Sequence, residues 1–334
     1  QANIYNCIPN YSEMGKEATT GFTGIWNLMS GQVVANTTAV GTQMLTGFNS
    51  SNASFHRWAT LYKYIRQGFI FLDNAKDYMG SEQDVSYISK KDMDRLKAET
   101  KFLIAYSYFS LFELYGPVPL ITEIEDPENK TIDYPRASVD EIVNYIDRLL
   151  QEVLDSNALP ETLFTESASG SLDYEHNNDR YNLKEIVRPT KVTVLALRAK
   201  LWVYAASPLF NGGYGEALQL TNKDGKHLFP DEDKTKWNTA KTHLETLFTF
   251  AEAKGHKLYY SKPGSNGLPD PNLSVYELFQ YYNDEILWAN GNNSYRIVGN
   301  DMERRTCPRG ANGFCHRAHS IQQRARPLPL YSTG

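Results

Sequence analysis

The sequence has few cysteines, no run of basic residues and no long apolar segment. Its 334 residues include three cysteines, and its formal net charge is −5 at pH 7. Nucleic acids are bound by concentrated basic surfaces, so this composition argues against a nucleic-acid partner. No apolar stretch approaches the roughly 20 residues that a membrane-spanning helix needs. With 41% hydrophobic and 22% charged residues, the chain is expected to fold into a packed globular protein.

The sequence also lacks the motifs of many enzyme classes. The chain contains no P-loop, no GxSxG, no HExxH and no dinucleotide-binding fingerprint. We therefore predict no cofactor and no catalytic residue. An all-α glycosidase stays an alternative, because hydrolysis needs only two carboxylates and the chain has 39 acidic residues. The acidic cluster at 224–233 lies beside lysine and glycine and is typical of a solvated loop.

The three cysteines leave two interpretations open. Cys307 and Cys315 are spaced for a short disulfide in an oxidising compartment, which would leave Cys7 single. His316 and His319 follow closely, but the spacing matches no standard zinc pattern. We predict no metal site, and either a disulfide or free thiols at the second and third cysteines.

The stretch 93–120 has the strongest helical pattern in the chain. Phe102, Ala105 and Phe109 lie at helical spacing on one face, and other apolar residues cover most of the rest. A helix that is apolar nearly all round must be enclosed by neighbours. Gly116 offers a left-handed cap, and the two prolines that follow it forbid continuation.

Apolar periodicity predicts four further helices besides this one, and two of the five repeat a small-large-small spacing. The helices are expected at about 54–79, 93–115, 138–154, 190–206 and 237–254. The spacing at Ala98, Phe102 and Ala105, repeated at 199–206, is that of a second tetratricopeptide (TPR) helix. Ser138 and Glu141 form a capping box. A short strand is expected at 285–288.

The predicted fold is mainly α, a superhelix of TPR-like helix pairs with a large irregular lobe. The pairs are expected at about 54–115, 138–206 and 237–290, and stacked pairs bury a continuous core. The loops 31–53, 155–187, 207–236 and 290–334 would form the lobe within a single domain over 1–334. The chain starts without Met and ends on PLYSTG, so we expect it to be truncated at both ends.

Four segments resemble, in order, motifs of the SusD/RagB family of outer-membrane nutrient-binding lipoproteins. They are RLKAETKFLIAYSYFSLFELYGPVPLITE, YPRASVDEIVNYIDRLLQEV, RPTKVTVLALRAKLWVYAASPLFNGG and NDEILWAN. The resemblance implies a TPR-like side, an irregular lobe and no enzymatic activity. It also implies a surface-exposed lipoprotein of the outer membrane that binds oligosaccharide and forms a lid on a SusC-like TonB-dependent transporter. From the same resemblance we expect that the N-terminal lipid anchor and the C-terminal third of such proteins are not included in this chain.

The glycan-binding residues are expected in loops where an aromatic ring neighbours an amide or a guanidinium. Sugars pack their C–H faces on rings, and their hydroxyls need polar partners. In the family the site draws on the loop before the first long helix and on loops after the third pair. The candidates are Trp26, Phe48, Asn49, Tyr282, Trp288, Asn292, Tyr295 and Arg296. Trp26 and Trp288 fit the core as well as the site. Trp58 and Trp202 are expected in the core, and Trp237 is expected to pack against a neighbouring helix.

The predicted function is non-catalytic capture of an extracellular oligosaccharide and its delivery to the transporter. A TPR-like scaffold that binds a peptide or a protein is the first alternative, and the glycosidase is the second. The sequence does not name the glycan, because ring stacking reports a sugar face and not a linkage.

Overall fold

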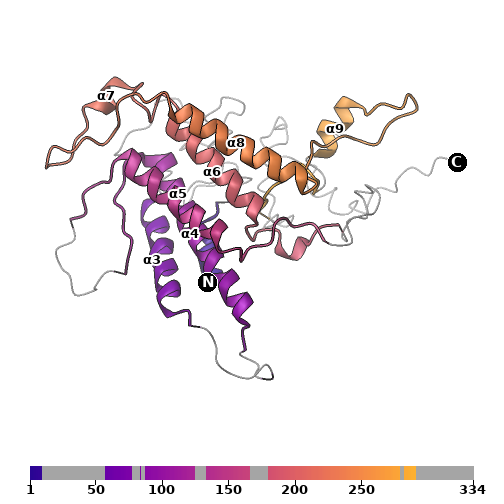
Figure 1. Ribbon diagram of the computed structural model, residues 1–334, viewed down its shortest axis with the longest axis horizontal. Helices are drawn as coiled ribbons and strands as arrows, with labels where there is room; N and C mark the ends of the chain where they lie inside the picture. The colour runs from indigo at the N-terminus through magenta and orange to yellow at the C-terminus, as the bar shows by residue number, and fades with distance from the viewer. Residues whose placement is uncertain are drawn as a thin grey trace, which may run out of the picture. The chain divides into compact units, whose positions relative to one another are not determined.

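The computed structural model describes residues 1–9, 57–76, 83, 87–124, 133–165, 180–278 and 282–290. The chain divides into two units, and all described helices belong to the unit made of Gln1–Ile8 and Arg57–Asn290 (Figure 1). The helices of this unit are η1 (Ala2–Cys7), α3 (Trp58–Asn74), α4 (Lys90–Tyr115), α5 (Val139–Asp155), η2 (Leu183–Glu185), α6 (Lys191–Ala206), α7 (Gly215–Leu218), α8 (Lys236–Ala253) and α9 (Pro271–Leu278). Isolated bridges are the only β-pairing in these ranges. The predicted mainly-α fold is therefore confirmed.

The long helices pack in series, as the TPR-like prediction requires. α3 contacts α4, α4 contacts α5, α5 contacts α6, and α6 contacts α8. Figure 1 shows α3 and α4 side by side and antiparallel. The predicted neighbours 54–79/93–115 and 138–154/190–206 are thus neighbours in the structure. The first helix of the predicted third pair, α8, lies against α6.

Helix α4 is enclosed by its neighbours from Ala98 to Phe112, where every residue except Lys101 and Tyr106 is buried. Its fully buried side chains form the centre of the main apolar cluster: Phe102, Leu103, Ile104, Tyr108, Leu111 and Phe112. The helix begins three residues earlier than predicted because the Ser89 hydroxyl caps it and accepts from the backbone N–H of Asp92. It ends at Gly116, whose φ is +65° and ψ is −123°. The positive φ agrees with the prediction, but the ψ lies outside the left-handed helical region.

A buried carboxylate on α4 fastens two other segments to it. Glu99 is fully buried, and its Oε2 accepts from Tyr5 Oη at 2.8 Å and Gln1 Nε2 at 3.0 Å. Its Oε1 accepts from Arg95 Nε at 3.0 Å and Arg188 Nε at 2.7 Å. Burial, reinforced by this carboxylate, raises the pKa of Tyr5. Because a buried charge is tolerated only when it is paired, η1 and the segment before α6 are held at this point.

Side-chain caps fix the starts of α5 and α6. The Ser138 hydroxyl accepts from the Glu141 backbone N–H, and the Glu141 carboxylate accepts from the Ser138 backbone N–H at 2.8 Å. These two hydrogen bonds confirm the predicted capping box. Thr190 and Thr193 form the equivalent pair at the start of α6. Each cap satisfies backbone donors that the first helical turn leaves without partners.

The turn after α6 depends on an asparagine and a glycine. Asn211 donates to the Asp233 carbonyl at 2.8 Å and accepts from its N–H at 3.1 Å. A Cβ at Gly212 would lie 2.3 Å from the Glu232 nitrogen, and its φ is +78°. This close approach excludes any side chain at that position. The predicted acidic loop at 231–233 is exposed.

Two expectations about tryptophans and one about a strand are wrong. Trp58 and Trp237 are 37% and 49% exposed, although both lie on apolar stripes of their helices. Trp202 packs against the core as predicted, and its indole N–H donates to Asp147 at 2.8 Å. Residues 285–288 form no strand, because Asn283 closes a turn by accepting from the backbone N–H groups of Glu285 and Ile286.

One cysteine lies within the described residues, and the other two lie outside them. Cys7 is a free, fully buried thiol, and burial raises its pKa to about 11. Cys307 and Cys315 lie outside the described residues. The single-domain prediction and the composition of the irregular lobe stay predictions.

Replacing Phe102 by Ala is expected to lower the free energy of unfolding by about 3–5 kcal/mol, because the lost ring leaves a cavity between close-packed helices. The ring is fully buried and lies edge-to-face with Trp288 at 5.5 Å. Phe248→Ala is the matched control, since that ring on α8 is 60% exposed. Urea unfolding monitored by circular dichroism measures both. Equal losses in the two variants would contradict the enclosure of α4.

Candidate functional site

The structure describes two of the eight predicted glycan-binding residues, Tyr282 and Trp288. Trp26, Phe48, Asn49, Asn292, Tyr295 and Arg296 lie outside the described residues. The sequence-predicted site therefore stays a prediction for those six positions.

Tyr282 lies beside a buried ionic cluster. Its ring packs edge-on against Tyr181 with centroids 4.8 Å apart, and burial raises its pKa to about 12. The neighbouring Asp284 is fully buried and accepts from Arg180 Nε and Nη2, each at 2.8 Å. The Tyr181 hydroxyl also donates to this carboxylate. The cluster attaches the segment 282–290 to Arg180, which lies 104 residues before Asp284 in the chain. Its role is therefore structural.

His256 completes this cluster from the turn after α8. Its Nδ1 bonds the Asp284 carbonyl at 2.8 Å, and its ring packs on Phe164 with centroids 4.6 Å apart. Its Nε2 is buried without a hydrogen-bond partner. Since the Nδ1 proton is donated to a carbonyl, Nε2 is the unprotonated nitrogen of a neutral ring. Burial accordingly lowers the pKa of His256.

Trp288 packs against α4 in the main core. Its ring lies edge-to-face with Phe102 at 5.5 Å and with Tyr106 at 5.3 Å. Its indole N–H donates to the Val187 carbonyl at 2.8 Å. The side chain is partly buried. These contacts account for the ring and its donor within the protein.

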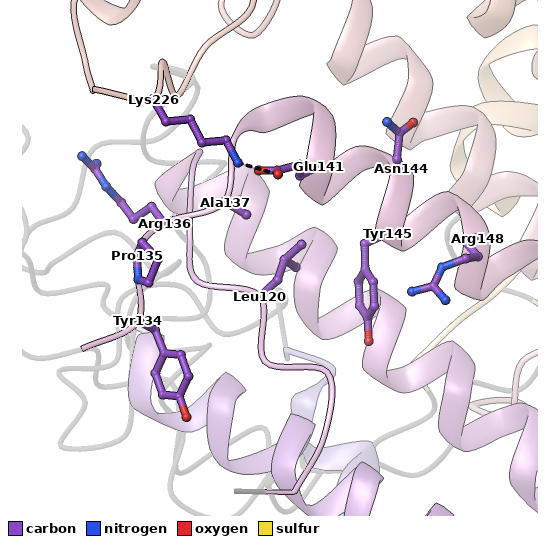
Figure 2. A pocket seen from close by; sticks show the side chains of 10 residues that line it. All are labelled: Leu120, Tyr134, Pro135, Arg136, Ala137, Glu141, Asn144, Tyr145, Arg148 and Lys226. Atoms are coloured by element: carbon purple, nitrogen blue, oxygen red, sulfur yellow. Dashed lines mark hydrogen bonds and ion pairs between the residues drawn. The ribbon is translucent and has the colours of Figure 1, made fainter. Parts of the chain in front are cut away.

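A groove beside α5 brings together the side-chain types that bind sugars. It has a volume of about 680 Å³, and we call it the α5 groove (Figure 2). Its lining residues are Leu120, Tyr134, Pro135, Arg136, Ala137, Glu141, Asn144, Tyr145, Arg148 and Lys226. Figure 2 shows the 134–136 segment on one side of the groove and α5 on the other.

The helical repeat of α5 explains one wall of the groove. The helix buries Ile142, Ile146 and their neighbours in the core, which leaves its opposite face for solvent. Asn144 and Arg148 are exposed on that face, one helical turn apart. The sequence carried this signal as polar positions on an amphipathic helix, but the pattern alone does not distinguish a groove wall from an ordinary solvated face.

The groove contains one tyrosine that is exposed and one that is buried. Tyr134 is 37% exposed, whereas Tyr145 is 7% exposed. The Arg148 guanidinium carbon lies 5.1 Å from the Tyr145 ring centroid, a cation–π distance. Burial raises the pKa of Tyr145 to about 12, so the phenol is neutral at physiological pH. A neutral phenol and an amide both donate and accept hydrogen bonds, as sugar hydroxyls require.

An ion pair closes one end of the groove. Lys226 Nζ donates to the Glu141 carboxylate, and this hydrogen bond is the main cause of the lowered pKa of Glu141. The same carboxylate accepts from the Ser138 backbone N–H in the capping box. Lys226 comes 85 residues after Glu141, so sequence spacing carried no signal for their meeting.

A second cavity of about 460 Å³ lies at the start of α5 and bears on the glycosidase alternative. Its lining includes the carboxylates of Asp140 and Asp231 together with His227. Asp140 accepts from Lys236 Nζ at 2.6 Å, and this ion pair occupies it. Glycoside hydrolysis needs one carboxyl group that is protonated and one that is free to act as base or nucleophile. A carboxylate paired with a lysine stays ionised, which disfavours it as the general acid.

Within the described ranges we find no group of three or more metal-ligating side chains. In the same ranges, no helix combines the length and the apolar character of a membrane span.

The comparisons with known proteins come from a family model and from solved structures. Residues 10–171 match the model SusD-like_3, a family described as starch-binding and associating with the outer membrane. The chain is similar to the solved protein BT4246, with 23% identity over 78% of this chain and 41% of that one, and a TM-score of 0.56. It also aligns with two Bacteroides fragilis proteins. One is the SusD-like carbohydrate-binding protein BF0978 (15% identity, 78% and 41% coverage, TM-score 0.47), and the other is the SusD-like protein BF3747 (17%, 78% and 39%, 0.46).

The similarity to BT4246 shows that this chain shares the fold of that protein. The comparison with curated proteins returns no match. The chain spans about two fifths of the length of the solved structures named above.

The buried His256 is expected to make stability depend on pH. Because burial lowers its pKa below the usual value of about 6.5, the unfolded chain binds the proton more tightly. Its neutral form is thus stable above about pH 6.5, and the free energy of unfolding falls as the pH drops below that value. Urea titrations between about pH 7.5 and 5.5 measure this slope. His256→Asn should flatten it relative to the exposed control His227→Asn. A slope unchanged by His256→Asn would exclude this histidine as its source.

Proposed function

We propose that this chain, whose residues 10–171 belong to the SusD-like family, captures an extracellular oligosaccharide at the outer membrane and delivers it to a TonB-dependent transporter without chemical change. The observation that carries the proposal is the lining of the α5 groove. An exposed ring, an amide and two guanidinium groups meet there on one surface. This combination matches a sugar, which presents C–H faces to rings and hydroxyls to polar groups.

Binding without hydrolysis fits the groove better than catalysis does. Among its described lining residues Glu141 is the single carboxylate, and Lys226 pairs with it. Retaining and inverting glycosidases need two carboxyl groups on either side of the scissile bond. The description of the matched family as starch-binding supports the same conclusion.

The loops of the predicted irregular lobe are proposed to hold glycan-binding residues as well. Trp26, Phe48 and Asn49 precede α3, and Asn292, Tyr295 and Arg296 follow the segment 282–290. Each of these places combines rings with amide or guanidinium groups, and family members use the same two regions. Trp288 is better explained by its packing on α4.

Capture is useful only when the ligand is handed on, so we propose a SusC-like TonB-dependent barrel as the partner. The proposed arrangement is a surface lipoprotein, anchored through a lipidated segment N-terminal to this chain, that closes over the mouth of the barrel. Delivery requires reversible binding. We therefore expect a dissociation constant on the order of micromolar to millimolar, about −8 to −4 kcal/mol.

Isothermal titration against a panel of oligosaccharides tests the capture step. Tyr134→Ala and Tyr295→Ala are each expected to lower affinity by about 0.5–1.5 kcal/mol, because each loses a stacking ring, while the melting temperature stays nearly unchanged. Tyr276→Ala is the matched control, since that tyrosine is 64% exposed on α9 and lies outside the groove. Unaltered affinity would remove the variant's residue from the site, and cleavage of any panel member would favour the glycosidase.

The delivery step is expected to leave a physical complex. Membranes of the native organism, solubilised in mild detergent and purified through a tag on the full-length protein, should yield a TonB-dependent barrel identified by mass spectrometry. The control is the same purification with an unrelated tagged surface lipoprotein. Glycan binding without any recovered barrel would leave capture standing and remove the delivery step.

A further inference from the structure

The α5 groove is positively charged on a protein that is negatively charged as a whole. Its lining has three cations, Arg136, Arg148 and Lys226, and one anion, Glu141. The formal net charge of the chain is −5. A local excess of positive charge on an acidic protein raises the local concentration of anionic ligands.

Two of the three cations lack a close anionic partner in the described structure. Lys226 and Glu141 pair with each other. The Arg148 side chain is 62% exposed, and its nearest carboxylate oxygen, on Glu152, lies 3.9 Å away. Arg136 is exposed, and no ion pair involves it among the described residues. The two guanidinium groups are therefore available to a ligand.

The two arginines approach the groove from different walls. Arg136 belongs to the segment before α5, and Arg148 lies about two and a half turns along α5 from the helix start, on the other side of the groove in Figure 2. A ligand lying along the groove meets one guanidinium at each side. Guanidinium groups bind oxyanions with two adjacent acceptor oxygens through two parallel hydrogen bonds, which a neutral hydroxyl does not offer.

From these observations we infer that the α5 groove selects acidic oligosaccharides, whose sugars carry carboxylate or sulfate groups. The inference rests on the proposed capture function and specifies its ligand class. Tyr134 and Asn144 contact the sugar ring and its hydroxyls, and Arg136 and Arg148 contact the anionic groups. The second cavity, lined by Asp140 and Asp231, has no arginine or lysine among its lining residues.

The experiment compares acidic oligosaccharides with neutral counterparts that share their backbone. The pairs are oligogalacturonate with its methyl ester, alginate oligosaccharide with its carboxyl-reduced form, and a sulfated galactan oligosaccharide with its desulfated form. Isothermal titration at 20 mM and 200 mM NaCl is run on the chain and on Arg136→Ala/Arg148→Ala. The control Arg66→Ala/Lys241→Ala removes two exposed cations outside the groove, so both variants carry the same net charge.

The expected result is that at least one acidic member binds about tenfold more tightly than its neutral partner at low salt, and that salt reduces this preference. The groove variant loses the preference, while the control variant keeps it. The pair that shows the preference distinguishes carboxylate from sulfate as the recognised group.

Four results would overturn the inference. Neutral and acidic members that bind equally, or a preference that survives in the groove variant, would exclude the arginines as selectors. Binding restricted to neutral glycans elsewhere in the panel would reject the acidic class and leave oligosaccharide capture intact. Indifference to every glycan, acidic or neutral, would reject the capture function as well and favour a scaffold that binds a peptide or protein.

Discussion

The burial of α4 between Ala98 and Phe112 is the constraint on which the rest of the described structure depends. A helical stretch with apolar side chains around most of its circumference is stable in water only if other elements cover it. α3 covers one side, α5 another, and η1 a third, while Trp288 fills a gap from the far end of the described chain. The buried carboxylate of Glu99 also requires neighbours, because its charge needs the hydrogen-bond donors of η1 and Arg188.

The helices were predictable because their information is local. Apolar periodicity and capping pairs lie within one or two turns of each other, so α4, α5 and α6 follow from the residues alone. Trp58 and Trp237 were misjudged because periodicity identifies the apolar face of a helix and not what covers it. The prediction of a strand at 285–288 was wrong for a related reason. Its alternation was too short to outweigh the turn that Asn283 closes.

The α5 groove was not predictable, because its lining comes from three distant segments. Arg148 belongs to a helix with a clear amphipathic pattern, but its polar face resembles any solvated surface. Lys226 reaches Glu141 across 85 residues. Glu141 serves two purposes at the groove, capping α5 through Ser138 and pairing with Lys226. The sequence reports the first of these roles and gives no sign of the second.

The contact between Phe102 and Trp288 has a consequence for synthesis on the ribosome. The two rings are separated by 186 residues in the chain, yet they meet edge-to-face at 5.5 Å. At about 5–20 residues per second, Trp288 emerges roughly 10 to 40 seconds after Phe102. Throughout that interval the aromatic side chains on one side of the nascent α4 stay exposed to water, because the residue that covers them has not been synthesised. A chain built around an early helix that closes late is therefore exposed to aggregation during translation, and its yield depends on how well chaperones protect that surface.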